Sequence, residues 1–212
     1  MEIVEILENL KITDNSYIIS FKREINFIPG QVIGIFHGIY NTRRIYSIAS
    51  GNKEENIRIL YKINPHGLIT PLLARLKKGD KLKISEPFGS FGVKKEKGIC
   101  IATGTGIAPF ASMYFSGMLD NKLLLHGSRT YNEFYFQQDL LNLSNNYIRC
   151  CSEEDIQGCF HGRVTNYVDE VLPINTNINY YLCGKAEMVV EMRDKLIDRG
   201  VSFNRIFAEI YF

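Results

Sequence analysis

The feature that most constrains the fold is a change in hydrophobic period near residue 95. Before this point, apolar and polar residues alternate with a period of two over residues 17–21, 31–36, 56–63 and 81–84. This alternation is typical of half-buried strands. Turn-forming residues such as Pro29-Gly30 and Asn64-Pro65 separate the segments. Several short strands joined by turns predict an antiparallel β-barrel.

After residue 95 the pattern changes to short apolar segments that alternate with helical ones. We expect strands at residues 98–102, 122–126, 147–151, 178–183 and 205–211, and helices at residues 109–119, 132–143, 163–171 and 186–199. Such alternation predicts a parallel β-sheet with helices on both faces. The solvated segment 94–97 marks the boundary, so we predict two domains, a barrel over residues 1–95 and an α/β domain over residues 96–212.

Composition excludes several classes of protein. Hydrophobic residues are 45% and charged residues 23% of the chain, an ordinary globular balance. The net charge is only +2, which makes nucleic acid an unexpected partner. No apolar run approaches the roughly 20 residues that cross a bilayer, and the N-terminus has no signal-peptide pattern. We therefore expect a cytoplasmic protein without membrane insertion.

The cysteines and histidines do not follow a metal-binding pattern. There are five cysteines and four histidines. Cys150 and Cys151 are adjacent in sequence, and no pair has the Cys-x-x-Cys spacing of structural zinc or iron–sulfur sites. We expect neither a disulfide framework nor a metal site.

A glycine-rich turn is the strongest local motif. An apolar segment runs into it and a helix follows, in the sequence Ile99-Cys-Ile-Ala-Thr-Gly104-Thr-Gly106-Ile-Ala-Pro109-Phe110. Glycine lets the backbone approach a ligand closely, and free N–H groups at a helix start favour an anionic pyrophosphate. Pro109 replaces the third glycine of Gly-x-Gly-x-x-Gly, so the motif alone also fits a tight strand–helix turn.

Two weaker motifs lie in the first half. In Arg44-Ile45-Tyr46-Ser47, the arginine offers a planar fork for phosphate and the tyrosine shares its face of the strand. Residues 67–70 open a helix that we expect to run from Thr70, as the N-cap, to Gly79. The N–H groups at that start provide a second anion site. Taken singly, each motif also fits an ordinary strand or helix cap.

Five motifs, taken in order, resemble the ferredoxin–NADP reductase superfamily. They are Arg44-x-Tyr46-Ser47, Gly67-x-x-Thr70, Gly104-Thr-Gly-Ile-Ala-Pro-Phe110, Cys183-Gly184 and Glu209-Ile-Tyr211. The resemblance covers nearly the whole chain. It implies a two-domain fold, an antiparallel β-barrel that binds FAD followed by an α/β parallel-sheet domain that binds NAD(P).

For the flavin, the resemblance implies roles for the barrel residues. Arg44 is expected to hold the FAD pyrophosphate, and Tyr46 to lie against the isoalloxazine. Ser47 is expected to reach flavin N5, where hydride arrives. The backbone N–H groups of one loop are expected to bind an FAD phosphate, and its residues are Gly67, Leu68, Ile69 and Thr70.

For the coenzyme and the hydride path, the resemblance implies roles near the chain's end. Cys183, beside Gly184, is expected near nicotinamide C4, in a polar cluster with Ser47 and Glu209. Tyr211, followed by Phe212, is expected to stack on the flavin and to move when nicotinamide enters. The coenzyme pyrophosphate is expected on the turn formed by Gly104, Thr105, Gly106, Ile107, Ala108 and Pro109.

The choice of coenzyme depends on charges around the 2′-position of the adenosine ribose. Ser128-Arg129 resembles the family segment in which an arginine contacts a 2′-phosphate, and Arg163 matches a second basic position. Ser152-Glu153 departs from the family's Ser-Arg pattern, because a glutamate stands in place of the arginine. The acidic Glu153 is expected to repel a phosphate. Two arginines against one glutamate favour NADPH over NADH.

The resemblance implies a ferredoxin–NAD(P)+ reductase-like flavoenzyme that exchanges electrons with ferredoxin or flavodoxin. Because the sequence has no iron–sulfur spacing, we expect that carrier to be a separate molecule. A reductase of free flavin, a reductase subunit of a larger complex, and a non-catalytic interaction or redox-sensing module remain as alternatives. Tightly retained FAD would argue against the free-flavin reductase.

Overall fold

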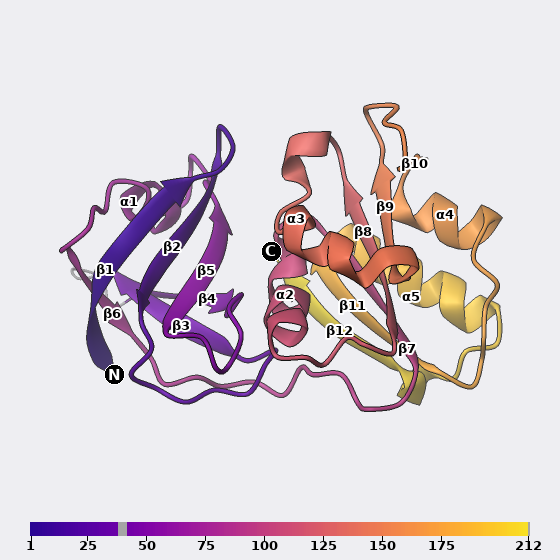
Figure 1. Ribbon diagram of the computed structural model, residues 1–212, viewed down its shortest axis with the longest axis horizontal. Helices are drawn as coiled ribbons and strands as arrows, with labels where there is room; N and C mark the ends of the chain where they lie inside the picture. The colour runs from indigo at the N-terminus through magenta and orange to yellow at the C-terminus, as the bar shows by residue number, and fades with distance from the viewer. Residues whose placement is uncertain (38–41, 212) are drawn as a thin grey trace. The chain divides into compact units, whose positions relative to one another are not determined.

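The chain folds into two compact units. The computed structural model describes residues 1–37 and 42–211. One unit comprises Met1–Gly92 with Ala111–Ser116, and the other comprises the rest. The elements of residues 1–92 are β1 (Glu2–Lys11), β2 (Ser16–Lys22), β3 (Val32–His37), β4 (Thr42–Ser47), β5 (Asn56–Lys62), α1 (Thr70–Leu73) and β6 (Lys81–Ile84), labelled in Figure 1.

The first unit is an antiparallel barrel. Its six strands have the order β4-β3-β6-β1-β2-β5. An antiparallel bridge between Ile48 and Ile59 joins the two outer strands of that order, and the Ala49 N–H donates to the Arg58 carbonyl at 2.8 Å. Buried side chains such as Ile19, Ile33 and Ile57 fill the interior. The structure thus confirms the predicted antiparallel barrel.

The helix of the first unit differs from the sequence prediction. Ile69, not Thr70, is its N-cap, and α1 ends at Leu73 rather than near Gly79. The Thr70 hydroxyl instead accepts a hydrogen bond from the Asn64 N–H at 2.9 Å. The prediction that Thr70 caps the helix was wrong, because it took account of the helix sequence alone. In the structure the Thr70 hydroxyl bonds to the preceding loop instead of to the helix N–H groups.

The second sheet is parallel throughout. Its six strands have the order β10-β9-β8-β7-β11-β12. The strands are β7 (Gly98–Thr103), β8 (Lys122–Ser128), β9 (Tyr147–Cys151), β10 (Phe160–His161), β11 (Asn179–Lys185) and β12 (Ile206–Tyr211). The α-helices are α2 (Ala108–Phe115), α3 (Gln137–Leu140), α4 (Val164–Glu170) and α5 (Ala186–Asp198). The 3-10 helices are η1 (Gly104–Ile107), η2 (Tyr131–Glu133), η3 (Leu141–Asn146) and η4 (Phe203–Arg205).

Helices cover both faces of this sheet, as predicted. Val168 of α4 and Met192 of α5 pack in one cluster with Ile101 and Leu182 of the central strands. Figure 1 shows α3 on the opposite face from α4 and α5. Central strands buried on both faces explain why the sequence of this half is apolar in short continuous runs.

The expected helix at residues 132–143 is broken into three short pieces. Phe136 has φ 59°, a left-handed conformation that an α-helix interior does not accept. The neighbouring Phe134 and Tyr135 are both buried, and Phe134 packs edge-on against His126. Burial of these aromatic rings overrides the helical pattern of the sequence.

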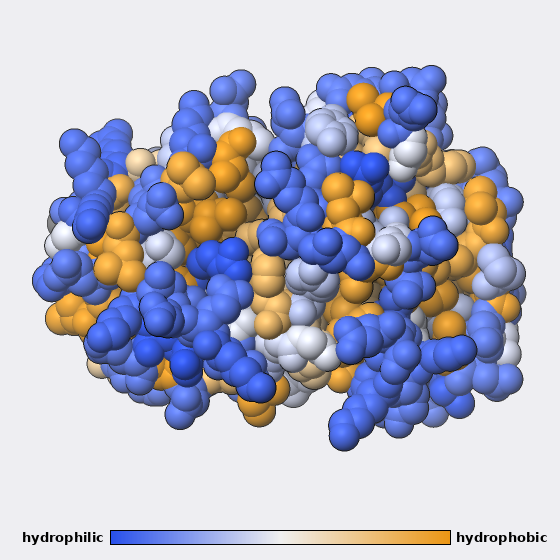
Figure 2. All heavy atoms as spheres, viewed as in Figure 1, coloured by the Kyte–Doolittle hydropathy of each residue, from blue (hydrophilic) through white to orange (hydrophobic). Residues whose placement is uncertain are grey.

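The face of the molecule seen in Figure 2 is mostly hydrophilic. On the face in Figure 2, apolar residues form separate patches among charged ones. Among residues 1–37 and 42–211, no helix combines the length and apolar character needed to cross a membrane.

Candidate active site

Three parallel strands bring the predicted coenzyme residues to one edge of the second sheet, the edge formed by the carboxyl ends of its strands. In the strand register, Cys183 of β11 pairs with Ala102 of β7 and with Glu209 of β12. Thr103 ends β7, and Tyr211 ends β12. Open parallel sheets bind ligands at the carboxyl ends of their strands, so this edge is the expected place for a ligand.

The glycine-rich turn packs tightly against β11. A Cβ on Gly106 would lie 2.4 Å from the Cys183 carbonyl oxygen, and a Cβ on Gly184 would lie 2.3 Å from Thr103 Oγ1. Gly104, with φ +54°, has nothing within 4 Å of its Cβ position. Glycine is therefore required at Gly106 and Gly184 by close packing, and at Gly104 it leaves bare backbone beside open space.

The remaining residues of the turn act through their backbone. Ile107, Ala108 and Pro109 are buried, whereas Thr105 is half-buried. The three buried side chains shape η1 and the start of α2 and cannot themselves cover a ligand. The part of the turn open to a ligand is thus centred on Gly104 and Thr105.

Cys183, Glu209 and Tyr211 form a polar cluster at this edge. Cys183 is fully buried, and burial, together with the negative charge of Glu209, raises the pKa of its thiol well above 9.0, although a hydrogen bond with Tyr211 opposes this. Burial raises the pKa of Glu209 to about 7. Near neutral pH the cluster therefore holds a neutral thiol beside a carboxyl group that exchanges its proton.

Two buried oxygen atoms at this edge have no protein partner among the described residues. They are Thr103 Oγ1 and Glu209 Oε2. A buried polar atom without a partner is uncommon, and a ligand is one explanation for it. These two oxygen atoms suit the amide and hydroxyl groups of a nicotinamide nucleoside. The residues present therefore fit a nicotinamide coenzyme. Thr103 is not among the residues predicted for the site, although its position between a buried strand and the first glycine indicates such a role.

The barrel residues of the predicted flavin site lie on β4. Arg44 and Tyr46 pair with Ile35 and Ile33 of β3, so all four share a face of the sheet. Arg44 is exposed, and Tyr46 is half-buried against the barrel core. Burial raises the pKa of Tyr46 to about 12, although the Arg44 charge opposes this. Ser47 is buried, with 3% of its surface exposed. An exposed guanidinium beside a neutral phenol fits a phosphate-bearing aromatic ligand.

The loop before α1 is held by Asn64. The Gly67 N–H donates to the Asn64 carbonyl at 2.9 Å, and Thr70 Oγ1 accepts from the Asn64 N–H at 2.9 Å. In the part of the chain that the structure describes, the N–H groups of Leu68 and Ile69 donate to no protein acceptor. These N–H groups fit a phosphate, whereas the Thr70 hydroxyl is already engaged.

The candidate adenosine end lies where β8 and β9 finish. The Glu153 N–H donates to the Arg129 carbonyl at 2.9 Å, and Arg129 Nε lies 3.7 Å from Glu153 Oε1. The Ser152 N–H likewise donates to the Ser128 carbonyl at 3.1 Å. Arg163 occupies the N-cap position of α4, and its guanidinium lies 2.9 Å from Glu191 Oε2. Both arginines therefore already face a carboxylate.

Two groups of the predicted site residues are each brought together within one unit. The glycine turn, Cys183, Glu209 and Tyr211 lie together on the second unit, and Arg44, Tyr46 and Ser47 lie together on β4 of the first. Phe212 lies outside the described residues.

Two family models match the chain and together cover most of it. The model described as "Oxidoreductase FAD-binding domain" matches residues 4–92, and the model described as "Oxidoreductase NAD-binding domain" matches residues 100–194. The solved structure of a ferredoxin NADP+ reductase from Neisseria gonorrhoeae superposes with a TM-score of 0.88 at 20% identity, over 100% of this chain and 98% of that one. This likeness shows the fold.

Several curated relatives are similar over most of the chain. The toluate 1,2-dioxygenase electron transfer component of Pseudomonas putida is 26% identical over 88% of this chain and 59% of its own. The probable dihydroorotate dehydrogenase B (NAD(+)) electron transfer subunit of Pyrococcus abyssi is 27% identical over 97% of this chain and 68% of its own. The chain thus spans about 59% of the Pseudomonas relative and 68% of the Pyrococcus one.

Proposed function

Because the chain belongs to the ferredoxin–NADP reductase-like superfamily, with an FAD-binding domain followed by an NAD-binding domain, we propose that it is a flavoenzyme that moves electrons between NAD(P)H and a separate electron carrier. One observation carries this proposal. The neutral thiol of Cys183, the titrating carboxyl of Glu209 and the unpartnered Thr103 Oγ1 meet at the carboxyl edge of the sheet, beside the bare backbone of Gly104.

The chain's own residues bind, orient and hold protons. When bound, FAD accepts a hydride from NAD(P)H and releases its electrons one at a time. The turn around Gly104 receives the coenzyme pyrophosphate, and Thr103 and Glu209 orient the nicotinamide end. Glu209 keeps an exchangeable proton at its carboxyl group, while burial keeps Cys183 as the thiol. On the flavin side, Arg44 holds pyrophosphate, Tyr46 supports the ring system and Ser47 lies at its reactive edge.

The aromatic residues near the chain's end are assigned to cover the flavin. Tyr211 ends β12, in register with Lys185 of β11, and is half-buried. In this proposal its ring stacks on the flavin and gives way when nicotinamide enters.

We assign NADPH as the preferred coenzyme, with NADH as the alternative. Arg129 and Arg163 both pair with carboxylates, but these pairs are exposed and contribute little energy. A 2′-phosphate, with its higher charge, replaces Glu153 beside Arg129 at small cost. Two arginines, each able to exchange an exposed carboxylate for the 2′-phosphate, support NADPH.

Ferredoxin or flavodoxin is the proposed carrier. The named relatives are electron transfer components, which supports an electron-carrying partner. The same names support a second candidate, a reductase subunit of a larger complex. The Pyrococcus relative, which is named as a subunit, matches over 97% of this chain.

Anaerobic stopped-flow spectroscopy tests the proposal. The FAD-loaded chain is mixed with NADPH or NADH, and the reduced protein is then offered ferredoxin, flavodoxin and free flavin. Reduction by the coenzyme followed by fast reoxidation by a protein carrier supports the proposal. Reoxidation by free flavin alone would favour a free-flavin reductase, and failure to bind FAD would refute a flavoenzyme.

A further inference from the structure

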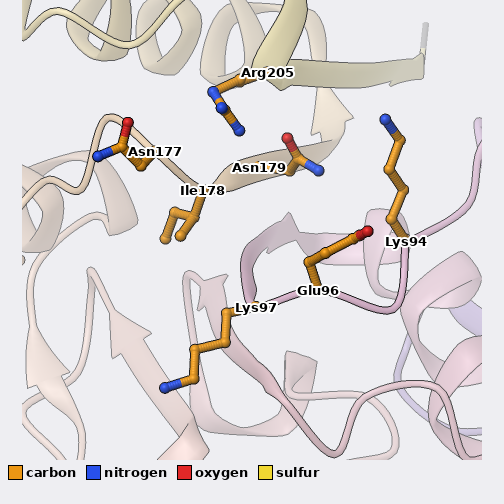
Figure 3. Close-up of a pocket in the computed structure, with 7 residues that line it drawn as sticks. All are labelled: Lys94, Glu96, Lys97, Asn177, Ile178, Asn179 and Arg205. Atoms are coloured by element: carbon orange, nitrogen blue, oxygen red, sulfur yellow. The ribbon is translucent and has the colours of Figure 1, made fainter.

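A cavity lies at the amino ends of the strands of the parallel sheet, opposite the carboxyl ends that form the candidate active site. It has a volume of about 240 Å³, and the segments before β7, β11 and β12 form it. Figure 3 shows the side chains that line it, Lys94, Glu96, Lys97, Asn177, Ile178, Asn179 and Arg205. Asn179 begins β11, and Cys183 lies four residues along the same strand, roughly 13 Å away at about 3.3 Å per residue. The cavity is therefore distinct from the coenzyme turn.

Positive charge dominates the lining of this cavity. It has three cationic side chains against the single carboxylate of Glu96. Among the described residues, neither Lys94, Lys97 nor Arg205 forms an ion pair with a protein carboxylate. In Figure 3 the Arg205 guanidinium points into the space beside Asn179, and Glu96 is directed towards Lys94. The guanidinium thus offers its donors to the cavity.

A buried lysine lies behind one wall of the cavity. Lys122 has only 2% of its surface exposed, and the one hydrogen bond of its ammonium among the described residues is a long one, 3.5 Å, to the Lys95 carbonyl. Lysine is almost never fully buried without a partner of opposite charge. Its stem lies next to Gly98, where a Cβ would be 3.4 Å from Lys122 Cδ and 2.9 Å from the Asn179 carbonyl oxygen. Lys122 therefore lies beside the backbone of Gly98 and Asn179, next to one wall of the cavity.

The wall of the cavity is fixed before any ligand arrives. The Lys94 N–H donates to the Tyr181 hydroxyl at 3.0 Å, and Asn179 Nδ2 donates to the same hydroxyl at 3.3 Å. Lys94 Nζ lies 5.3 Å from the centre of the Phe207 ring. These contacts hold Lys94 against β11 and β12, which reduces the entropy lost on binding.

We propose that this cavity binds a phosphate group, either as inorganic phosphate or as part of a small phosphorylated metabolite. Phosphate matches the planar fork of the Arg205 guanidinium, which points into a cavity whose lining carries more cations than carboxylates. The volume is below the range of roughly 300–1,000 Å³ of sites for larger ligands, which argues against a dinucleotide. This site is additional to electron transfer and does not depend on it.

Two-dimensional NMR of the 15N-labelled, FAD-loaded chain tests the site. Inorganic phosphate and glycerol phosphate are titrated separately at constant ionic strength, and the side-chain amides of Asn177 and Asn179 report binding. We expect saturable shifts at these amides. Tighter binding of one probe identifies the source of the phosphate group.

Variants test whether the named cations bind the anion. Arg205→Gln should weaken phosphate binding about tenfold, since a charged hydrogen bond is lost. Lys94→Gln should weaken it less, since this ammonium lies against the Phe207 ring and contributes only its charge. Lys22→Gln, at an exposed lysine that ends β2, should leave the affinity unchanged. Bleaching of the flavin by NAD(P)H should be equal in the native chain and in the three variants. Shifts that do not saturate, shifts confined to residues 104–109, or equal affinity in the Arg205 variant would overturn the proposal.

Discussion

Replacing Glu209 by glutamine changes how the stability of the protein depends on pH. Burial raises the pKa of this carboxyl group from 4.5 to about 7, so the native state favours the protonated form. The stability that this preference contributes is fully present below pH 4.5 and is lost as the pH rises to about 7. Glutamine has nearly the shape of the protonated acid and does not titrate. We therefore expect Glu209→Gln to gain stability relative to the native chain as the pH rises.

The size of this effect follows from the two pKa values. A change from 4.5 to about 7 corresponds to roughly 3 kcal/mol. Glu209 is half-buried, so solvent screening reduces the effect to about 1–2 kcal/mol. The relative gain in the free energy of unfolding should appear between about pH 4.5 and pH 7 and remain constant above that range.

Urea unfolding of the FAD-loaded protein at several pH values measures this change. The matched control is Glu170→Gln, an exposed carboxylate at the end of α4, which should follow the native pH dependence. The same samples are reduced anaerobically with NADPH, and we expect slower bleaching in Glu209→Gln. A difference in stability between Glu209→Gln and the native chain that is constant across this pH range would refute the account of a buried, proton-exchanging carboxyl group.

Three further substitutions test the site and its supports. Gly106→Ala places a Cβ 2.4 Å from the Cys183 carbonyl oxygen, so the turn must shift, and the KM for the coenzyme should rise about tenfold; an unchanged KM would contradict this. Asn9→Ala removes a hydrogen bond of 2.8 Å to the Leu73 carbonyl at the end of α1, and urea unfolding should show a loss of about 1–3 kcal/mol; a loss within the error of the measurement would argue against this support. Glu153→Gln removes the carboxylate at 3.7 Å from an arginine, and steady-state kinetics should show the KM for NADPH falling about threefold with NADH unaffected; an equal change for both coenzymes would contradict the proposed 2′-phosphate site.

The two-part architecture could be predicted from the sequence because the hydrophobic period changes along the chain. Strand boundaries at residues 81–84 and 147–151 were predicted without error, since alternation and flanking turns agree there. Cys183 and Glu209 are neighbours because β11 and β12 pair in parallel. The order of the motifs in the sequence only implied this pairing. Local patterns were sufficient wherever burial on a sheet decided the structure.

Tertiary contacts decided what the sequence could not predict. Thr70 was expected to cap α1, but its hydroxyl accepts a hydrogen bond from Asn64, six residues earlier. Phe136 breaks the expected helix because the aromatic residues before it are buried. The cationic cavity combines Lys94 with Arg205, and their juxtaposition depends on the order of strands in the sheet. No local pattern contains that information.

The most direct test of the central claim is the flavin absorbance of the FAD-loaded chain after anaerobic mixing with excess NADPH or NADH. The proposed function predicts that FAD remains bound through purification and that its absorbance bleaches completely, with a rate that saturates as the coenzyme concentration rises. Flavin that stays oxidised in the presence of both coenzymes would contradict the assignment of this chain as an electron-transferring reductase.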